Sequence, residues 1–482
     1  MGVYNVSYSD FMRKKATIMG LGLYPEGSGI AATKYLLTQN YDLIITDRRT
    51  AQQLCTPIQA IRQFIQTHHL KNRVTYHLNG HKISDFKPKN TDLIVKNPAI
   101  SPDSPFLKEA QKNKTPITSD TALFLERFPG TVIGITGTRG KSTTTQLIYE
   151  ILAQSKKPVI LGGNIAISPL KYLSKTTKKN IAVLELPAQQ LSALSQTKKG
   201  PHIAVITNIL PDHLNFYKNS RQYINEKKRI FTYQTADDFT IFNFDNPKTR
   251  ALAAKKKSKP FWFSLKKLPA KHFGTYKAGE KFYFRDAKGE HPIMHIRDIR
   301  LPGSHNQANI LAAICAAHLM HAPLSAIKKV LKTSSGLRFR LQKIKSKEGI
   351  IFFNDSTATT PDGTMAALST LSKQYPKHSI TLIAGGIAKV PDYRQLAQQI
   401  DQQTKHLILL PGTAGAKIKQ LIPRNSAVVT TSTRNLAEAV RLAKNKTNKP
   451  GIILLSPAAA SYNQFLNEFD RGQQFNQLIK QT

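Results

Sequence analysis

A glycine-rich turn between an apolar strand and a helical segment is the feature that most restricts the fold of this chain. It reads GITGTRGKSTTTQLI, from Gly134 to Ile148. Backbone N–H groups of such a turn and of the following helix N-terminus bind phosphate, while a lysine neutralises the outer phosphates and the next hydroxyl ligates magnesium. Lys141 and Ser142 occupy these two positions. The turn therefore predicts a nucleotide-binding α/β domain.

Strand and helix patterns alternate along the whole chain, which favours parallel α/β sheets. In the first region we predict strands at Ala16–Met19 and Leu43–Thr46 around a helix at Ile30–Gln39. The second region opens with a strand at Val132–Thr136 and includes a lysine-rich section, Lys255–Glu290, of loops and short strands. In the third region, after Gly336, we predict strands at Ile350–Phe353, Ile380–Ala384, His406–Leu410 and Ile452–Leu455.

The length of 482 residues exceeds what one hydrophobic core usually organises. We therefore predict three domains. Residues 1–125 form an N-terminal Rossmann-like domain with a parallel sheet, residues 126–335 a central P-loop domain that binds ATP, and residues 336–482 a C-terminal Rossmann-like α/β domain.

The net charge of +41 comes from 70 Lys and Arg residues against 29 acidic residues. Such a surplus is typical of nucleic-acid-binding proteins. Here the basic residues are dispersed, in short clusters such as Lys255–Lys257, without the aromatic residues on which single-stranded nucleic acids stack. A solvated basic surface that attracts polyanionic nucleotides is the preferred interpretation, with nucleic-acid binding as the alternative.

Cysteine content and hydropathy bear on the compartment. Cys55 and Cys315 are the only cysteines, too few for a disulfide framework or a thiolate metal site. The apolar stretches, such as Gly451–Leu455, are too short to span a membrane, and the N-terminus lacks the features of a secretory signal. We expect a cytoplasmic protein that does not insert into membranes.

Five further segments follow the glycine-rich turn in an order that matches one superfamily. The sequence GTRGKS, Gly137 to Ser142, matches the motif GTxGK[ST] better than the general phosphate-binding motif GxxxxGK[ST]. The five segments are LEL (Leu184–Leu186), NILPDHLNFY (Asn208–Tyr217), SHNQANILAA (Ser304–Ala313), GLRFR (Gly336–Arg340) and NDSTATTPDG (Asn354–Gly363). Together with the glycine-rich turn, they make the chain resemble the Mur ligase and folylpolyglutamate synthase superfamily.

The two ends of the chain resemble the MurD branch of the Mur ligase family. The N-terminal TIMGLGLYPEGSGIAATKYLL with the later ITDRR is similar to its substrate domain, and LLSPAAASYNQFLNEFDRG (Leu454–Gly472) is similar to its closing motif. This resemblance implies an ATP-dependent ligase, expected to be monomeric, that adds glutamate to UDP-N-acetylmuramoyl-L-alanine through an acyl phosphate in peptidoglycan synthesis. D-glutamate is favoured, but L-glutamate, another amino acid or another acceptor is left open.

The resemblance also implies the ATP and metal sites, with Lys141 on the phosphates and two Mg²⁺ ions. Catalytic roles fall on Lys141, Glu185, His213 (beside Asp212) and Lys227, the last carbamylated, although the adjacent Lys228 is a competing assignment. The expected metal ligands are Ser142, Glu185, His213 and carbamylated Lys227. The expected ATP-binding residues are Gly137, Thr138, Gly140, Lys141, Ser142, Thr143, Asn306, Asn309, Arg340 and Asp355.

For the other two substrates the resemblance points to nine residues. Those expected near the UDP-sugar are Asp47, Arg48, Arg49, Asn97, Asn164 and Gln190, and those expected near glutamate are Thr359, Lys389 and Ser461. Arg471 is expected to stabilise the C-terminal turn. The chain departs from the MurD pattern at Thr357, where lysine is usual, at ELPAQQL (Glu185–Leu191), at Asn97–Pro98, and by an insertion around Tyr24–Gly27. These departures touch substrate-facing positions.

Overall fold

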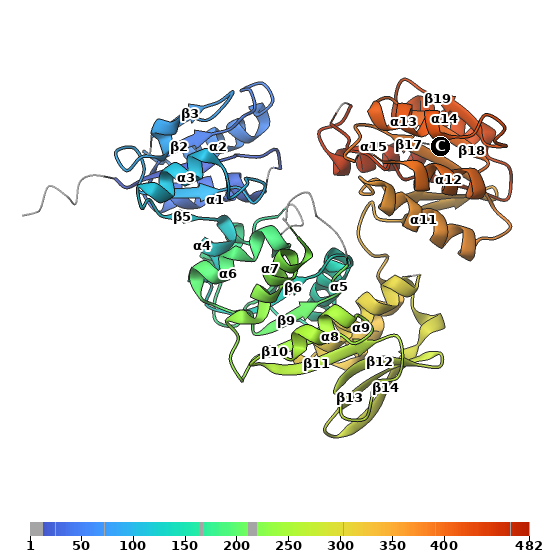
Figure 1. Cartoon of the computed structure of the whole chain (residues 1–482), viewed down its shortest axis with the longest axis horizontal. Helices are drawn as coiled ribbons and strands as arrows, with labels where there is room; N and C mark the ends of the chain where they lie inside the picture. Colours follow the sequence, from blue (N-terminus) through green and yellow to red (C-terminus); the bar gives the residue numbers. More distant parts are fainter. Residues whose placement is uncertain are drawn as a thin grey trace, which may run out of the picture. The chain divides into compact units, whose positions relative to one another are not determined.

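The computed structural model contains three β-sheets whose strands are mainly parallel, each with helices packed against it (Figure 1). The residues that it describes are 13–24, 26–71, 73–163, 167–210, 219–301, 303–390, 392–462 and 464–481.

The N-terminal sheet has five parallel strands in the order β3-β2-β1-β4-β5. The strands are β1 (Lys15–Met19), β2 (Asp42–Thr46), β3 (Val74–His77), β4 (Leu93–Lys96) and β5 (Ile117–Thr118). The connecting helices are α1 (Ser28–Thr38), α2 (Cys55–Thr67), the 3-10 helix η2 (Ile83–Phe86), α3 (Pro105–Lys112) and α4 (Asp120–Arg127).

The second sheet has nine strands in the order β14-β13-β12-β11-β10-β9-β6-β8-β7. They are β6 (Thr131–Thr136), β7 (Val159–Gly163), β8 (Ile181–Glu185), β9 (Ile203–Ile206), β10 (Phe239–Asn243), β11 (Lys259–Ser264), β12 (Gly274–Ala278), β13 (Lys281–Asp286) and β14 (Gly289–His295). The helices are α5 (Lys141–Gln154), η3 (Pro169–Lys175), η4 (Ala188–Gln190), α6 (Ser192–Thr197), α7 (Ser220–Thr232), α8 (Pro247–Ala253), η5 (Ile296–Asp298), α9 (Ser304–Leu319) and α10 (Leu324–Thr333).

The third sheet has six strands in the order β15-β16-β20-β17-β18-β19, and only β15 pairs antiparallel. The strands are β15 (Gln342–Lys347), β16 (Ile350–Asn354), β17 (Ser379–Gly385), β18 (His406–Leu410), β19 (Val429–Ser432) and β20 (Gly451–Leu455). The helices are α11 (Pro361–Gln374), α12 (Arg394–Gln403), α13 (Thr413–Leu421), α14 (Leu436–Lys446) and α15 (Glu468–Lys480).

The central strands are apolar on both faces because helices cover both sides of each larger sheet. In β8, Ala182 and Leu184 join one core cluster, whereas Ile181 and Val183 join another. Successive residues of β16 alternate between two clusters in the same way. Buried parallel strands therefore have continuous apolar sequences, as observed here.

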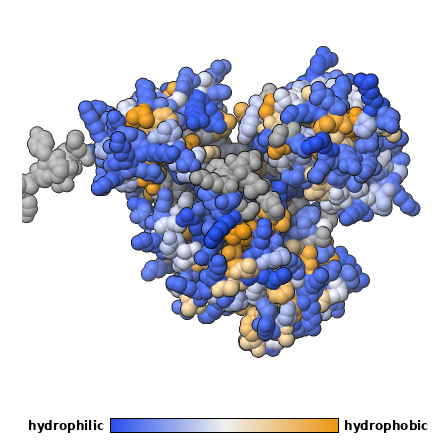
Figure 2. Space-filling model, in the orientation of Figure 1, coloured by the Kyte–Doolittle hydropathy of each residue, from blue (hydrophilic) through white to orange (hydrophobic). Residues whose placement is uncertain are grey.

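The fold class and strands predicted from sequence are confirmed. The lysine-rich section Lys255–Glu290 contributes β11 to β13 and the start of β14, which extend the second sheet. Contacts divide the chain into two compact units, residues up to Ser334 and residues from Ser335, and the division into three domains remains a prediction. Within the described residues, no helix is long and apolar enough to cross a membrane, and the face drawn in Figure 2 is mainly hydrophilic.

Candidate active site

The glycine-rich turn joins β6 to α5 at the carboxyl edge of the nine-stranded sheet. Gly137 and Gly140 have φ of 147° and 82°, which side chains rarely allow. A Cβ on Gly137 would lie 1.9 Å from Thr207 Oγ1, and one on Gly140 would lie 2.1 Å from Asn309 Oδ1. Both positions therefore require glycine for conformation and for space.

The end of β9 holds this turn in place. Asn208 Oδ1 accepts a hydrogen bond from Arg139 N at 2.9 Å, and its carbonyl accepts one from Thr138 N at 2.9 Å. The Thr207 hydroxyl donates to Arg139 O at 2.6 Å. Sequence reasoning did not assign this role to Thr207 or Asn208, although Asn208 opens a motif that it singled out.

Two lysine side chains meet at one carbonyl of the turn. Lys141 Nζ donates to Gly137 O and to Thr138 O, both at 3.1 Å, and Lys227 Nζ donates to Gly137 O at 2.9 Å. Lys227 is only 1% exposed, and its Nζ lies 4.6 Å from the ring centroid of Tyr223, one helical turn earlier. The Tyr223 hydroxyl is 3.1 Å from Thr138 Oγ1. Lys228, the competing assignment, is partly accessible.

Oxygen-bearing side chains surround the same turn. Glu185 ends β8 and is 1% exposed, and the residue paired with it in β6 is Ile135, two residues before Gly137. Ser142 and Thr143 lie in the first turn of α5, and Thr143 is buried. Carboxylate and hydroxyl oxygens fit Mg²⁺, which prefers hard oxygen ligands and phosphate oxygens. No group of three or more His, Cys, Asp and Glu that could hold a metal alone occurs among the described residues, and His213 and Asp212 lie outside them.

Asn306 and Asn309, both expected among the ATP-binding residues, lie on one face of α9. Asn309 Nδ2 is 3.4 Å from Asn306 Oδ1, and Asn309 packs against Gly140. These two residues therefore lie next to the glycine-rich turn.

The loop after β16 holds Asp355 inside the C-terminal unit. Its Oδ1 accepts a hydrogen bond from Leu341 N at 2.9 Å and its Oδ2 accepts one from Ser456 Oγ at 2.7 Å. Burial raises the pKa of this carboxyl to about 6. Arg340, the residue before Leu341, is exposed. Asp355 thus fixes the backbone next to Arg340, and its contact with ATP remains a prediction.

The three residues predicted for glutamate come from neighbouring loops at the carboxyl edge of the third sheet. Lys389 Nζ donates to Thr359 Oγ1 at 3.1 Å. Ile387 and Ala460 exchange two backbone hydrogen bonds of 2.9 Å, which brings the loop of Lys389 beside Ser461. Ser461 is 1% exposed, and its hydroxyl has no hydrogen-bond partner among the described residues. A cation and a buried hydroxyl thus lie on adjacent loops.

The pKa of the Lys389 ammonium is set mainly by the protein atoms around it and secondarily by charged neighbours. Lys389 stays accessible to solvent, yet the protein atoms around it lower the pKa of its ammonium, against the opposing effect of the Glu468 carboxylate. Arg471 is fully buried and donates to Ser356 Oγ at 3.0 Å, to Ser356 O at 2.8 Å and to Ala459 O at 3.1 Å. Arg471 therefore ties the loops together, as its expected structural role requires.

The residues predicted for the UDP-sugar organise a turn of the N-terminal sheet. Asp47 is 2% exposed, its Oδ2 accepts from Leu21 N at 2.9 Å, and its Oδ1 accepts from Arg49 N at 3.0 Å. Asn97 Nδ2 donates to Gly20 O at 3.2 Å. Asp47 and Asn97 thus act on the Gly20–Gly22 turn.

The remaining predicted residues differ in how far they can be placed. Arg48 and Arg49 are exposed at the end of β2. Gln190 is buried, and its Oε1 has no hydrogen-bond partner among the described residues. Asn164 lies outside the described residues.

Two departures from the MurD pattern have visible contacts. The Thr357 hydroxyl donates to Phe339 O at 2.8 Å, so it joins its loop to the backbone before β15, at a position where the family usually has a cation. In the inserted segment, Glu26 O accepts from Ser168 N at 2.8 Å, and the Glu26 carboxylate pairs with Lys171. The insertion therefore contacts the segment that follows β7.

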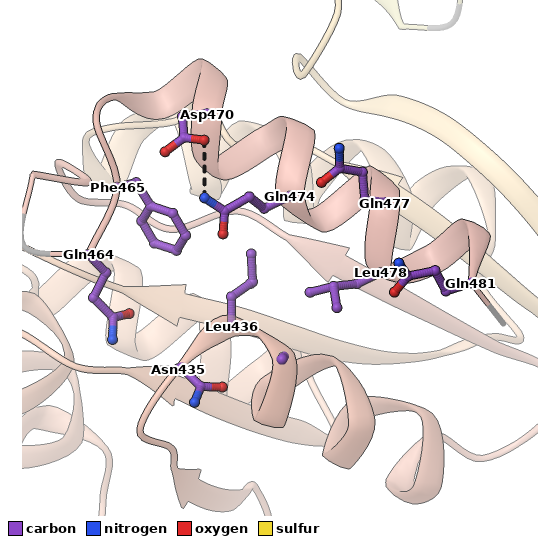
Figure 3. Close-up of a pocket in the computed structure, with 10 residues that line it drawn as sticks. Asn435, Leu436, Gln464, Phe465, Asp470, Gln474, Gln477, Leu478 and Gln481 are labelled. Atoms are coloured by element: carbon purple, nitrogen blue, oxygen red, sulfur yellow. Dashed lines mark hydrogen bonds between the residues drawn. The ribbon is translucent and has the colours of Figure 1, made fainter. Parts of the chain in front are cut away.

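A cavity of about 620 Å³ lies between α14 and α15 (Figure 3). Amide side chains such as Gln477 and Gln481 line it around Leu436 and Phe465, and Gln474 Nε2 donates to Asp470 Oδ1 at 3.0 Å. None of the predicted site residues lines this cavity.

Comparison with known proteins decides the family. Residues 135–317 match the Mur ligase middle domain, and residues 339–459 match the Mur ligase glutamate ligase domain. The UDP-N-acetylmuramoylalanine–D-glutamate ligase of Koribacter versatilis is 33% identical over 471 residues, 98% of each chain. The enzyme of the same name from Roseiflexus sp. is 32% identical, over 97% of this chain and 98% of its own. The chain belongs to the Mur ligase family.

Solved structures agree on the fold of this Mur ligase. UDP-N-acetylmuramate-alanine ligase MurC from Thermotoga maritima superimposes with a TM-score of 0.61 at 16% identity, covering 98% of this chain and all of that one. A pseudomurein peptide ligase type C from Methanothermus fervidus gives a TM-score of 0.56 at 18% identity, over 98% and 100% of the two chains. As a Mur ligase, the protein is an ATP-dependent ligase, which confirms the predicted reaction class.

Proposed function

We propose that this Mur ligase joins D-glutamate to UDP-N-acetylmuramoyl-L-alanine, using ATP, in the cytoplasmic steps of peptidoglycan synthesis. The observation that carries the proposal is the similarity over nearly the whole chain to relatives named for that reaction. The loops around Lys389, Thr359 and Ser461 support it, because they offer a cation and a buried hydroxyl to an acidic amino acid.

The proposed chemistry has two steps. A carboxylate oxygen of the muramoyl substrate attacks the γ-phosphorus of ATP, and ADP leaves. The amine of glutamate then attacks the acyl carbon, loses a proton and expels phosphate. The first step is needed because carboxylates resist attack by amines. Fixed cations stabilise the negative charge on the phosphoryl group while it is transferred. Lys141 is the cation held at the turn that binds the phosphates.

The proposed Mg²⁺ ligands are Ser142, Glu185, His213 and carbamylated Lys227, in a site with two ions. Bound Mg²⁺ would neutralise the phosphates and polarise the phosphorus that is attacked. Carbamylation is supported by the contact of two lysine ammonium groups with one carbonyl. Buried like charges oppose each other, so conversion of Lys227 to an anion would relieve the repulsion and add oxygen ligands.

The proposed amino-acid site assigns a carboxylate of glutamate to Lys389. A charge-assisted hydrogen bond to an ammonium is stronger than one between neutral groups. Ser461 Oγ supplies a second hydrogen bond to glutamate, because this hydroxyl has no hydrogen-bond partner among the described residues. Thr359 orients the ammonium through its hydroxyl.

Phosphate release tests the proposal. Purified enzyme with ATP, Mg²⁺ and UDP-N-acetylmuramoyl-L-alanine should release phosphate when D-glutamate is added and far more slowly with L-glutamate, lysine, diaminopimelate or no amino acid. Comparable rates with another amino acid would reassign the substrate within the family. Release that needs no muramoyl nucleotide would reassign the acceptor.

A further inference from the structure

Lysines gather where the parallel strands of the nine-stranded sheet begin. Pairs of lysines precede three strands, β7, β8 and β9, and in the sheet these strands lie side by side with β6. The amino ends of parallel strands share one edge of a sheet. We define the lysine edge as Lys156, Lys157, Lys178, Lys179, Lys198 and Lys199.

The lysine edge lies at the opposite end of these strands from the candidate active site. Lys178 and Lys179 precede β8, whereas Glu185 ends it. A five-residue strand spans roughly 15 Å, which exceeds the Debye length at physiological salt. The lysine edge is therefore not a contribution to ATP binding at the glycine-rich turn.

Contacts within the protein account for little of this charge. Lys199 Nζ donates to the carbonyls of Leu125 and Glu126, at 3.2 and 2.8 Å. The other five lysines form no ion pair with a described residue, and all of them except Lys157 are exposed. Two acids beside these strands are already engaged, since Glu126 pairs with Arg127 and Asp238 pairs with His202.

Helix ends explain only part of the pattern. A cation near a helix C-terminus interacts favourably with the helix dipole, and Lys156 and Lys198 follow α5 and α6 at such positions. Lys178 and Lys179 instead follow a turn after a 3-10 helix that already ends in Lys175. The helix dipole accounts for one lysine at a helix C-terminus, and not for a second lysine before each strand. Stabilisation of the helix ends therefore does not explain the whole charge of the lysine edge.

We propose that the lysine edge binds the anionic surface of a phospholipid membrane. The lysine pairs before β7 and β8 lie on neighbouring strands about 4.8 Å apart, and the pair before β9 lies on the other side of β6, so the three pairs form a row that suits a plane of headgroups. Recognition of single-stranded nucleic acid uses stacked aromatics, and no Phe, Tyr or Trp is adjacent in the sequence to any of the six lysines. The attachment is peripheral and electrostatic, and it leaves the carboxyl edge open to substrates.

Vesicle co-sedimentation of the full chain tests this inference. Vesicles of phosphatidylcholine with about one third phosphatidylglycerol should bind the protein at about 0.1 M salt and release it at about 0.5 M, and pure phosphatidylcholine should not bind it. Changing Lys156, Lys178, Lys179 and Lys198 together to Gln should weaken binding by on the order of a thousandfold, from about 1 kcal/mol for each lysine. Ligation should be unchanged, which also shows that the variant folds.

The matched control removes four other exposed lysines of the same unit, Lys266, Lys281, Lys329 and Lys332. It should bind within about threefold of the unchanged protein, because only charges near the membrane contribute strongly. An equal loss in the control would show attraction by net charge alone and overturn the inference. Absence of vesicle binding would also overturn it, as would RNA that binds through the same four lysines and displaces the vesicles at equal phosphate concentration.

Discussion

Replacing Lys389 by Ala tests the amino-acid site most directly. Its ammonium reaches Thr359 Oγ1 at 3.1 Å and remains accessible to a ligand. A hydrogen bond between charged groups contributes about 1.5–3 kcal/mol. Loss of that bond should raise the KM for glutamate roughly tenfold to a hundredfold. The KM values for ATP and the muramoyl nucleotide should change little, because their predicted residues lie elsewhere in the sequence.

The dependence on pH adds a second readout for the same residue. Burial lowers the pKa of Lys389, and only its protonated form attracts a carboxylate. The KM for glutamate should therefore rise with alkaline pH, and the rise should begin at lower pH than the ordinary lysine pKa would give. In the Ala variant this rise should disappear.

Steady-state kinetics with each of the three substrates varied in turn provides the measurement. Lys377→Ala is the matched control, since Lys377 is an exposed lysine of the same unit. It should leave every KM unchanged. An unchanged glutamate KM in Lys389→Ala, or an equal loss for all three substrates, would refute the assignment of Lys389 to the amino acid.

Three further predictions concern the phosphate-binding turn and the core. Lys141→Ala should abolish ligation without lowering the melting temperature, because its side chain serves a loop; near-normal turnover would exclude the assignment. Lys227→Ala should be almost inactive and partly rescued by short carboxylic acids, with Lys228→Ala near normal; rescue of Lys228→Ala instead would move carbamylation by one residue. The raised pKa of Asp355 means that the folded protein binds the extra proton, so stability should fall by on the order of 3 kcal/mol as pH rises from about 4 to about 6. Asp355→Asn, compared by thermal melting across that range, should abolish the decline, and an unchanged decline would contradict this account.

Much of the fold could be predicted from sequence because its signals are local. Each strand such as β18 (His406–Leu410) is a short apolar run, and the turn at Gly137–Gly140 needs residues without side chains. The same turn identified Lys141, since lysine follows the last glycine directly. Resemblance to a family identified Lys227, which the structure places against Gly137 O.

Residues whose roles depend on distant segments could not be predicted in this way. Asn208 meets Arg139 only because β9 and β6 are adjacent in the sheet. The local sequence around Asp47 does not reveal that its carboxylate accepts backbone hydrogen bonds from Leu21, Gly22 and Arg49. A polar side chain at a strand end has the same local sequence whether it faces a ligand or a neighbouring loop.

The direction of the strands explains how a chain with a net charge of +41 can keep a selective site. The buried Glu185 ends β8, and Lys141 and Lys227 contact the glycine-rich turn, so the charged groups of the candidate site lie at the carboxyl ends of the strands. Loops at the amino ends lie beyond the screening length and are free to accumulate lysines. Because the two sets of loops alternate along the chain, lysines that share the amino edge of the nine-stranded sheet are dispersed in the sequence. Net charge alone therefore does not reveal whether a basic protein of this fold binds polyanions at its catalytic edge or at the opposite one.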